Sequence, residues 1–103
     1  MLLRHTTPIR NLPNIQRHGL LCSKSLGKLK VVWLHAPFKN WWAAMHVAER
    51  HGAKIEAVVT LEVEVPRSWL RRSRKGLWYC TRDIPADRIR RLFGFVELAR
   101  VAG

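Results

Sequence analysis

Acidic side chains are scarce in this chain of 103 residues, and none precedes Glu49. Seven Asp and Glu stand against nineteen Lys and Arg, which gives a formal net charge of +12. So large an excess of one sign repels itself in a folded domain, and it is typical of proteins that bind nucleic acid. We therefore predict a polyanionic partner, RNA or DNA. A basic surface kept only for solubility is the alternative.

Cysteine and long apolar runs are also lacking. Cys22 and Cys80 have no Cys-x-x-Cys spacing, so we predict no disulfide framework and no metal site. No apolar run approaches the roughly 18 to 20 residues that a membrane span needs, and the MLLRH start is too short in its apolar part for a secretory signal. These absences favour a cytoplasmic protein. The length and the 48% hydrophobic content predict a single compact domain over residues 1–103.

The hydrophobic pattern predicts an α+β fold with mostly antiparallel strand pairing. Strands are expected over residues 2–7, 31–35, 55–65, 76–81 and 95–101, and helices over 11–19, 40–52 and 86–92. In the helix over 40–52, which Asn40 would cap, the apolar stripe contains Trp41, Ala44, Met45 and Ala48. In the strand over 55–65, strict alternation places Glu62 and Glu64 on a solvated face.

Basic residues crowd one short segment, which we predict to be an exposed basic loop over residues 67–75. A loop of this charge would grip a nucleic-acid backbone through its phosphates. The residues are Arg67, Arg71, Arg72, Arg74 and Lys75.

Three stretches, taken in order, resemble the ADP-ribosyltransferase superfamily, and within it most closely the catalytic lobe of the tRNA 2′-phosphotransferases. LRHTT at residues 3–7, with Ile15 and a following Gly-Leu, is similar to the family's L-Y-H-G-T and a helix ending in I-x-x-x-G-L. The second stretch has VWLH at 32–35, VAERHG at 47–52 and VV at 58–59, beside V-H-L-S, V-G-x-R-H-G and V-V-L. The third has GLW at 76–78 and DIPADRI at 83–89, beside G-V-W-L and V-P-P-x-Y-I. The opening stretch is equally similar to DNA-modifying ADP-ribosyltransferase toxins.

The resemblance implies split antiparallel β-sheets with two or three short helices, and a cleft between the sheets that holds the cofactor NAD. His5 would orient the ribose and nicotinamide end, and the backbone of Thr6 would bind the carboxamide. An ordinary strand histidine is the alternative for His5. The cofactor-binding residues that we predict are His5, Thr6, Thr7, His35 and Trp42.

Four positions carry specific expectations. Arg50 matches the family arginine that contacts the transferred phosphate, a task that suits a guanidinium, so we predict His5 and Arg50 as the catalytic residues. An arginine that only stabilises the end of its helix is the alternative. His35 stands where the family has Ser and would add a group that titrates near neutral pH. Trp42 lies off the apolar stripe of its helix, which favours a stacking role, whereas Trp41 is expected in the core.

Two features of the family are missing. The late strand over residues 77–80 has no Glu, and the additional amino-terminal lobe of the phosphotransferases has no counterpart. We therefore hold three hypotheses. The first is an NAD-dependent enzyme that acts on nucleic acid, by ADP-ribose transfer or by removal of an RNA 2′-phosphate. The second is a non-catalytic nucleic-acid-binding module of the same fold. The third is a subunit whose partner supplies the missing groups.

Overall fold

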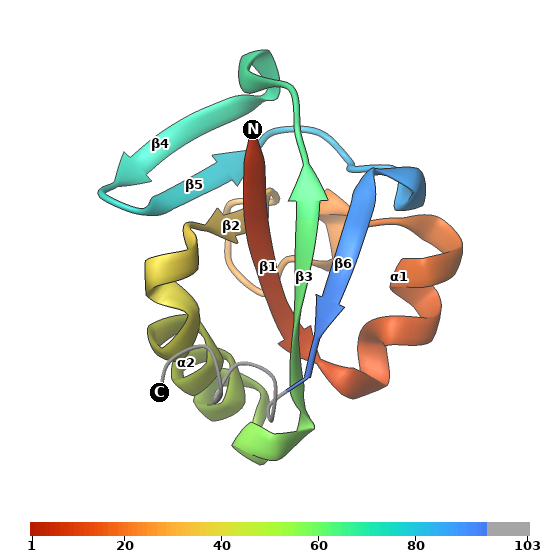
Figure 1. Ribbon diagram of the computed structural model, residues 1–103, viewed down its shortest axis with the longest axis vertical. Coiled ribbons are helices and arrows are strands. Elements are labelled where there is room, and N and C mark those ends of the chain that lie inside the picture. Colours follow the sequence, from red (N-terminus) through yellow and green to blue (C-terminus); the bar gives the residue numbers. More distant parts are fainter. Residues whose placement is uncertain (95–103) are drawn as a thin grey trace.

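The computed structural model describes residues 1–94, which form an α+β fold with a six-stranded antiparallel sheet and two α-helices (Figure 1). The strands and α-helices are β1 (Leu2–Pro8), α1 (Leu12–His18), β2 (Val32–His35), α2 (Asn40–His51), β3 (Val58–Glu64), β4 (Leu70–Arg74), β5 (Leu77–Cys80) and β6 (Ile89–Phe93). Short 3-10 helices lie at Ile9–Asn11, Cys22–Lys24, Pro37–Lys39, Ile55–Ala57, Arg67–Trp69 and Ala86–Arg88. The predicted class and antiparallel pairing are confirmed. The strand predicted over 95–101 lies outside the described residues.

None of the helices within residues 1–94 combines the length and the apolar character that crossing a membrane requires. The cytoplasmic location stays a prediction.

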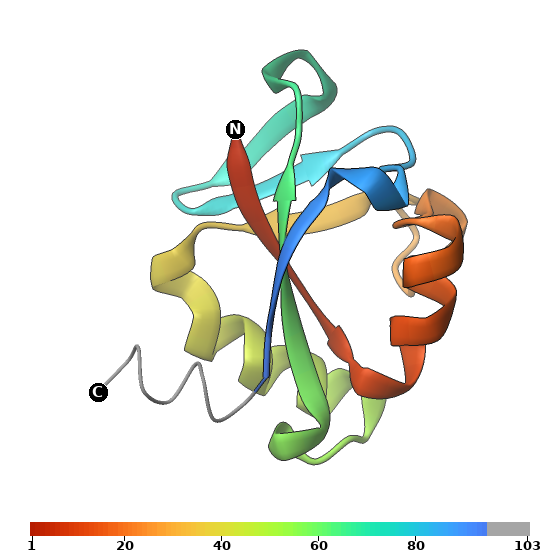
Figure 2. The same cartoon turned by 45° about the vertical axis from the view of Figure 1, so that its right-hand side comes forward.

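The sheet is nearly divided between its two middle strands. Its order is β4-β5-β2-β1-β3-β6, and β1 pairs with β3 at seven positions along its whole length. Between β1 and β2 the structure places one pair, Arg4 with His35. Beyond that pair the strands diverge, and Figure 2 shows β2 and β5 running across the direction of β1 and β3. The sheet therefore consists of a β1–β3–β6 half and a β2–β5–β4 half, and the edge of β1 after Arg4 has no pairing with β2.

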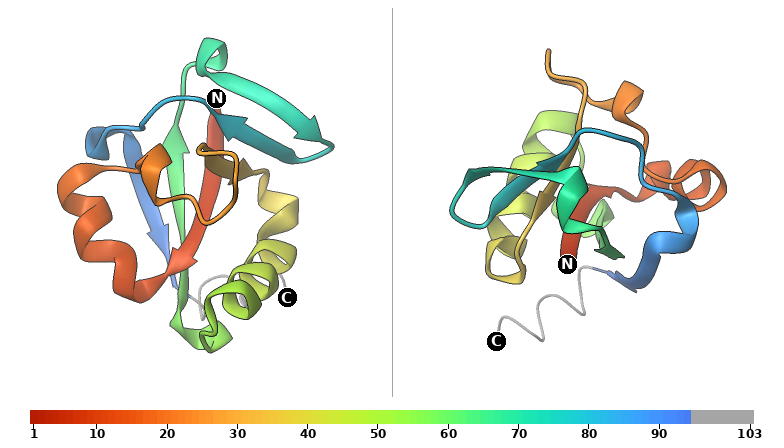
Figure 3. Two further views of the ribbon diagram at one scale, coloured as in Figure 1. Left: turned by 180° about the vertical axis from the view of Figure 1, so that it is seen from behind. Right: turned by 90° about the horizontal axis from the view of Figure 1, so that it is seen from above.

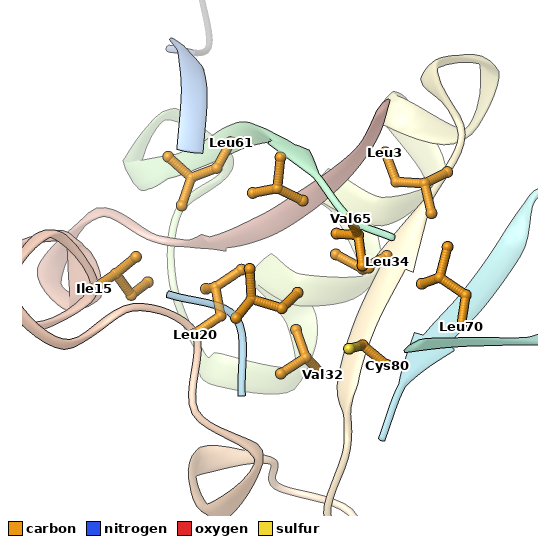
Figure 4. Close-up of a cluster of buried hydrophobic side chains, with 11 residues drawn as sticks. Leu3, Ile15, Leu20, Val32, Leu34, Leu61, Val65, Leu70 and Cys80 are labelled. Carbon is orange, nitrogen blue, oxygen red and sulfur yellow. The ribbon is translucent and has the colours of Figure 1, made fainter. Parts of the chain in front are cut away.

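One apolar cluster joins the two halves. Figure 4 shows side chains from β1, α1, β2 and β3 pointing toward one another, with Leu70 and Cys80 added from β4 and β5. Burying a Val or Leu side chain fully contributes about 1.5–3 kcal/mol, so this cluster is what holds the halves at their crossing angle. A second, smaller cluster of Ala44, Ala48 and Val58 packs α2 against β3.

Gly19 fixes the position of α1. Its φ of 80° is in the left-handed region, and the next residue, Leu20, forms an antiparallel bridge with Ile84 through two backbone hydrogen bonds of 2.8 and 2.9 Å. A Cβ on Gly19 would collide with the Ile84 carbonyl oxygen. Glycine is required at this position because both the backbone conformation and the close approach exclude a side chain.

The helix predicted over 86–92 is wrong. Residues 86–88 form one 3-10 turn, and β6 follows and pairs with β3. Asp83 and Pro85 resemble the start of a helix, but pairing covers an edge of β3 that would otherwise be open, and this tertiary contact decides the structure.

The strand predicted over 55–65 is shorter than expected, and the face that was predicted to be solvated is partly buried. Ile55–Ala57 is a 3-10 helix, and β3 begins at Val58. Glu62 is not solvated: its carboxylate lies 3.5 Å from the guanidinium of Arg4, and the two side chains are 18% and 12% exposed. Thr60, on the same face, is fully buried.

Helix α2 spans the predicted residues, and the predicted burial of Ala44 and Ala48 is confirmed, but Met45 of the same expected stripe is not buried. Met45 is 62% exposed, whereas Ala43, Ala44 and Ala48 are buried. The small alanines face β1 and β3, so the helix approaches the sheet closely. Asn40 is the first helical residue and its side chain makes no capping hydrogen bond, because the 3-10 turn at Pro37–Lys39 leads directly into the helix.

Candidate functional site

A cleft of about 1080 Å³ opens where the two halves of the sheet diverge. It is lined by the edges of β1 and β2, by α1 and α2, and by the segment of residues 20–31. Figure 3, left, shows this segment crossing β1 between the two helices. The volume is slightly above the range of roughly 300–1000 Å³ that is typical of small-molecule sites.

The structure brings most of the predicted site residues to this cleft. The predicted residues that line it are His5, Thr6, Thr7, His35, Trp42, Arg50 and Arg74. Four predicted nucleic-acid contacts do not line it, namely Arg67, Arg71, Arg72 and Lys75. The cleft thus unites positions from β1, β2, α2 and β4 that are distant in sequence.

The place where β1 and β2 diverge, next to the pair of Arg4 with His35, is called the fork here. His5 lies at this fork as a neutral imidazole with its hydrogen on Nδ1. Its Nδ1 lies 2.8 Å from the carbonyl oxygen of Trp33, and because a carbonyl only accepts, Nδ1 carries the hydrogen. Burial lowers the pKa of His5, the hydrogen bond to Trp33 opposes this, and the nearby charge of His51 lowers the pKa further. At neutral pH the ring therefore keeps Nε2 as a hydrogen-bond acceptor.

A buried chain of hydrogen bonds closes the fork behind His5. His35 Nδ1 donates to the Ala36 carbonyl at 3.0 Å, so Nε2 accepts from the hydroxyl of Thr6 at 2.7 Å. The hydrogen of Thr6 is then used, and Thr60 donates to Thr6 Oγ1 at 3.0 Å. Every polar atom in this chain has a defined direction, which ties β2, β1 and β3 together.

The expectation that His35 titrates near neutral pH is wrong. Burial lowers the pKa of His35 to about 4, the hydrogen bond to Ala36 opposes this, and the charges of His5 and Arg4 lower it further. The ring is neutral at pH 7 and both of its nitrogens are occupied. Its observed contacts are with the protein, so it holds the two strands at the fork.

One side of α2 presents rings and a cation to the cleft. Trp42, His46 and Arg50 follow one another at intervals of four residues, and all three line the cleft. The rings of Trp42 and His46 are stacked with centroids 5.2 Å apart and planes 5° from parallel. Trp42 is 44% exposed and Lys39 lies 5.2 Å from its ring. The prediction that Trp42 lies off the buried stripe is confirmed.

His46 was not predicted as a site residue, although the i, i+4 spacing from Trp42 to His46 to Arg50 is a signal for a shared face. Two lysines were missed as well. Lys24 and Lys28 line the cleft from the segment before β2, whose sequence shows no periodicity.

The cleft has a positive lining. Lys24, Lys28, Arg50 and Arg74 contribute side chains to it, and within residues 1–94 no carboxylate lines it. An atom added as Cβ on Gly27 would lie 3.9 Å from Nη2 of Arg50, so the guanidinium reaches from α2 to the opposite wall. Burial lowers the pKa of His51, and the charges of Arg10 and Arg50 lower it further. This local potential favours an anionic ligand.

The segment of residues 20–31, which lines the cleft, is stabilised by hydrogen bonds between its own residues. Lys30 donates through Nζ to the carbonyl of Ser25 at 2.7 Å, and the Ser25 hydroxyl donates to the carbonyl of Leu29 at 3.1 Å. These bonds hold the turn around Gly27 opposite Arg50.

Residues 67–75 do not form a loop. They form a 3-10 helix at Arg67–Trp69 and the strand β4, which is antiparallel to β5, and the connecting turn contains Gly76 with a φ of 75°. The side chains of all five predicted cations are exposed. Because Leu70 is buried and β4 follows a strand geometry, its arginines are distributed over both faces.

Both cysteines are free thiols, and burial is the main cause that raises the pKa of each. Among residues 1–94 no three His, Cys, Asp or Glu side chains are grouped so as to hold a metal ion.

No protein-family model matches the sequence, and no curated protein matches it significantly. Function therefore has to be inferred from the residues of the cleft.

Proposed function

We propose that the chain is an NAD-dependent, ADP-ribosyltransferase-like enzyme that acts on nucleic acid, either by transferring ADP-ribose or by removing a 2′-phosphate from RNA. The observation that carries the proposal is the meeting of His5, Trp42 and Arg50 in one cleft. His5 lies on β1, whereas Trp42 and Arg50 lie on α2. His5 and Arg50 match positions with a cofactor role and a phosphate role in the family that the sequence resembles, and Trp42 is a stacking candidate because it lies off the buried stripe of its helix.

The lining of the cleft suits the parts of a dinucleotide. The exposed ring of Trp42 offers a surface for stacking a base, and Arg50 with Lys24 and Lys28 offers charge for a pyrophosphate. Nε2 of His5 would accept a hydrogen bond from a ribose hydroxyl. The edge of β1 beyond Arg4, which is not paired with β2, would provide backbone groups at Thr6 for a carboxamide.

When bound, NAD would supply an ADP-ribosyl group, whose transfer to an acceptor breaks the glycosidic bond to nicotinamide. The residues of the chain would contribute orientation and charge. His5 and the edge of β1 would fix the ribose in one position, and Arg50 would neutralise phosphate charge on the cofactor or on the RNA.

The alternative is a non-catalytic nucleic-acid-binding module. It is favoured by the buried network at the fork, in which both nitrogens of His35 are bonded to the protein and the ring is neutral at pH 7. In this alternative the rings and cations of the cleft bind nucleotides without any reaction.

Calorimetric titration with NAD and with ADP-ribose tests the cofactor site. We expect saturable binding at up to millimolar ligand, and we expect Arg50→Met to weaken it about tenfold, as the loss of a charge-assisted hydrogen bond does. Arg17→Met is the matched control, because Arg17 is also exposed in the last turn of a helix but does not line the cleft. Folded protein that binds neither ligand contradicts the proposal.

Incubation with labelled NAD and cellular RNA or DNA separates the enzyme from the module. Label on the nucleic acid supports ADP-ribose transfer, and NAD-dependent loss of phosphate from 2′-phosphorylated RNA supports the second reaction. Binding of NAD without either reaction favours the non-catalytic module.

A further inference from the structure

The β2–β5–β4 half of the sheet has one face that carries both rings and arginines. Trp33 of β2 and Tyr79 of β5 are paired in register, and their rings lie 5.4 Å apart at 58°. Arg71 of β4 is paired with Tyr79, and Arg74 is paired with Leu77. Paired residues of neighbouring strands point to the same side of a sheet. We call the surface formed by Trp33, Tyr79, Arg71 and Arg74 the Trp33 face.

Arg72 points to the opposite side. It is paired with Trp78, its guanidinium lies 5.7 Å from the centre of that ring, and Trp78 packs against the apolar core. Alternation along β4 places Arg71 and Arg72 on opposite sides, and a register shift between Arg72 and Arg74 brings Arg74 opposite Leu77, on the Trp33 face.

The charges of the Trp33 face are not compensated by the protein. The two ion pairs within residues 1–94 join Glu64 to the amino terminus and Glu62 to Arg4. Arg71 donates through Nη1 to the adjacent Leu70 carbonyl at 3.0 Å, which leaves its other donors for a ligand. Trp33 is 38% exposed, so part of its ring is available for stacking.

The Trp33 face leads directly to the cleft. Trp33 and Arg74 belong to both, and the carbonyl of Trp33 is the hydrogen-bond partner of His5. A polymer lying on this face would therefore reach the residues that the proposed function uses.

We propose that the Trp33 face binds single-stranded nucleic acid and guides it to the cleft, an inference that rests on the proposed function and specifies the substrate of the same site. Unpaired bases would stack on Trp33 and Tyr79, and phosphates would bind Arg71 and Arg74. Rings on a sheet surface can stack only on bases that are free of a duplex, so the inferred substrate is a single strand. Because stacking tolerates every base, we expect low sequence selectivity.

Fluorescence anisotropy with labelled oligo(U) and oligo(dT) of about 12 nucleotides, and with the oligo(dT)·oligo(dA) duplex, tests this inference. Arg71→Glu and Arg72→Glu make the same change in charge on opposite sides of one strand. We expect Arg71→Glu to weaken single-strand binding about tenfold and to reduce the salt dependence by about one to two counterions, and Arg72→Glu to weaken it no more than about threefold. Equal losses in the two variants overturn the proposal, because they indicate attraction by net charge alone.

Two substitutions of Tyr79 test whether its ring stacks on a base. Tyr79→Leu removes the ring and is expected to weaken binding about tenfold, whereas Tyr79→Phe retains the ring and is expected to bind like the wild type. Thermal melts of both variants show whether a loss arises from unfolding. Tighter binding of the duplex, or equal competition by poly-glutamate, overturns the proposal. The difference between oligo(U) and oligo(dT) shows whether RNA or DNA is the natural strand.

Failure of this inference and failure of the proposed function are distinguishable. Arg71 lies outside the cleft, so Arg71→Glu is expected to bind ADP-ribose as the wild type does. Intact ADP-ribose binding with equal effects of Arg71→Glu and Arg72→Glu refutes the Trp33 face alone. If Arg71→Glu weakens single-strand binding and Arg72→Glu does not, while the wild type does not bind ADP-ribose, the cofactor proposal alone is refuted.

Discussion

Arg4, in one half of the sheet, has surroundings opposite to those of Arg71 and Arg74 in the other half. In the β1–β3–β6 half, Arg4 is largely buried, is paired with Glu62 at 3.5 Å and lies 4.4 Å from the centre of the Phe93 ring. In the β2–β5–β4 half, Arg71 and Arg74 are exposed and form no ion pair with any residue from 1 to 94. The charge of Arg4 is paired within the fold, whereas the charges of Arg71 and Arg74 are available to a ligand.

The halves meet at the pair of Arg4 with His35, and the cleft opens beside this pair. The β1–β3–β6 half, in which β1 is paired with β3 along its whole length, supports an edge of β1 that is not paired with β2 after Arg4. Substitutions in the two halves should therefore differ, with effects on stability in the first half and on ligand binding in the second.

The largest effect is expected from the core of the β1–β3–β6 half. Leu61→Ala removes a side chain that is 1% exposed, and it should lower the free energy of unfolding by about 2–5 kcal/mol. Leu92, its partner in register on β6, is 44% exposed, so Leu92→Ala should cost less than about 1 kcal/mol. Urea denaturation measures both values. Equal losses would show that the core does not lie where the structure places it.

His35, which lies where β1 and β2 diverge, should make the free energy of unfolding depend on pH. In the unfolded chain His35 titrates near 6.5, and in the folded chain near 4, so as the pH falls the unfolded state takes up the proton first. The stability from this group is complete above about pH 6.5 and is lost between about 6.5 and 4, by about 3 kcal/mol in total.

His35→Gln tests this dependence, because glutamine has no group that titrates in this range. The difference in unfolding free energy between wild type and variant should narrow by about 3 kcal/mol from pH 7 to pH 4. A difference that is constant with pH would mean that His35 is not buried in its neutral form.

A smaller effect is expected from the ion pair of the first half. Glu62→Gln leaves the largely buried guanidinium of Arg4 without its counter-charge and should cost about 2 kcal/mol. A double-mutant cycle with Arg4→Met measures the coupling of the two side chains. Additive losses in the cycle would remove the contrast between the two halves.

The smallest effect on stability is expected from the second half. Arg71→Glu and Arg74→Glu should change the free energy of unfolding by no more than about 0.5 kcal/mol, because both side chains are exposed and without ion pairs. Thermal denaturation provides the measurement. A loss comparable to that of Glu62→Gln would assign these arginines to the fold.

The elements with a strong local signal were predicted well. The 3.6-residue period and Gly52 mark α2, and the β-branched and aromatic residues mark β2 and β5. The elements specified by tertiary pairing were missed. β4 consists mainly of arginines and forms because it pairs with β5 across the turn at Gly76, and β6 forms because it pairs with β3.

The candidate site shows the same limit. His5 and Arg50 were predicted from a resemblance, and Trp42 from its place off the apolar stripe of its helix. The divergence of β1 from β2, however, depends on where pairing stops, which no local pattern encodes. The buried state of His35 likewise follows from its contacts with Thr6 and Ala36, so its pKa was predicted incorrectly. Lys24 and Lys28 reach the cleft through an irregular segment with no periodic signal.

The central claim, that the cleft beside His5 binds an ADP-ribose unit, is tested most directly by two-dimensional NMR of the ¹⁵N-labelled protein titrated with ADP-ribose. We expect the backbone amides of Thr6 and Thr7 and the indole of Trp42 to shift along one saturable curve, while the amide of Arg91 on β6 stays in place. Resonances of β1 and α2 that remain unmoved at millimolar ADP-ribose would contradict it.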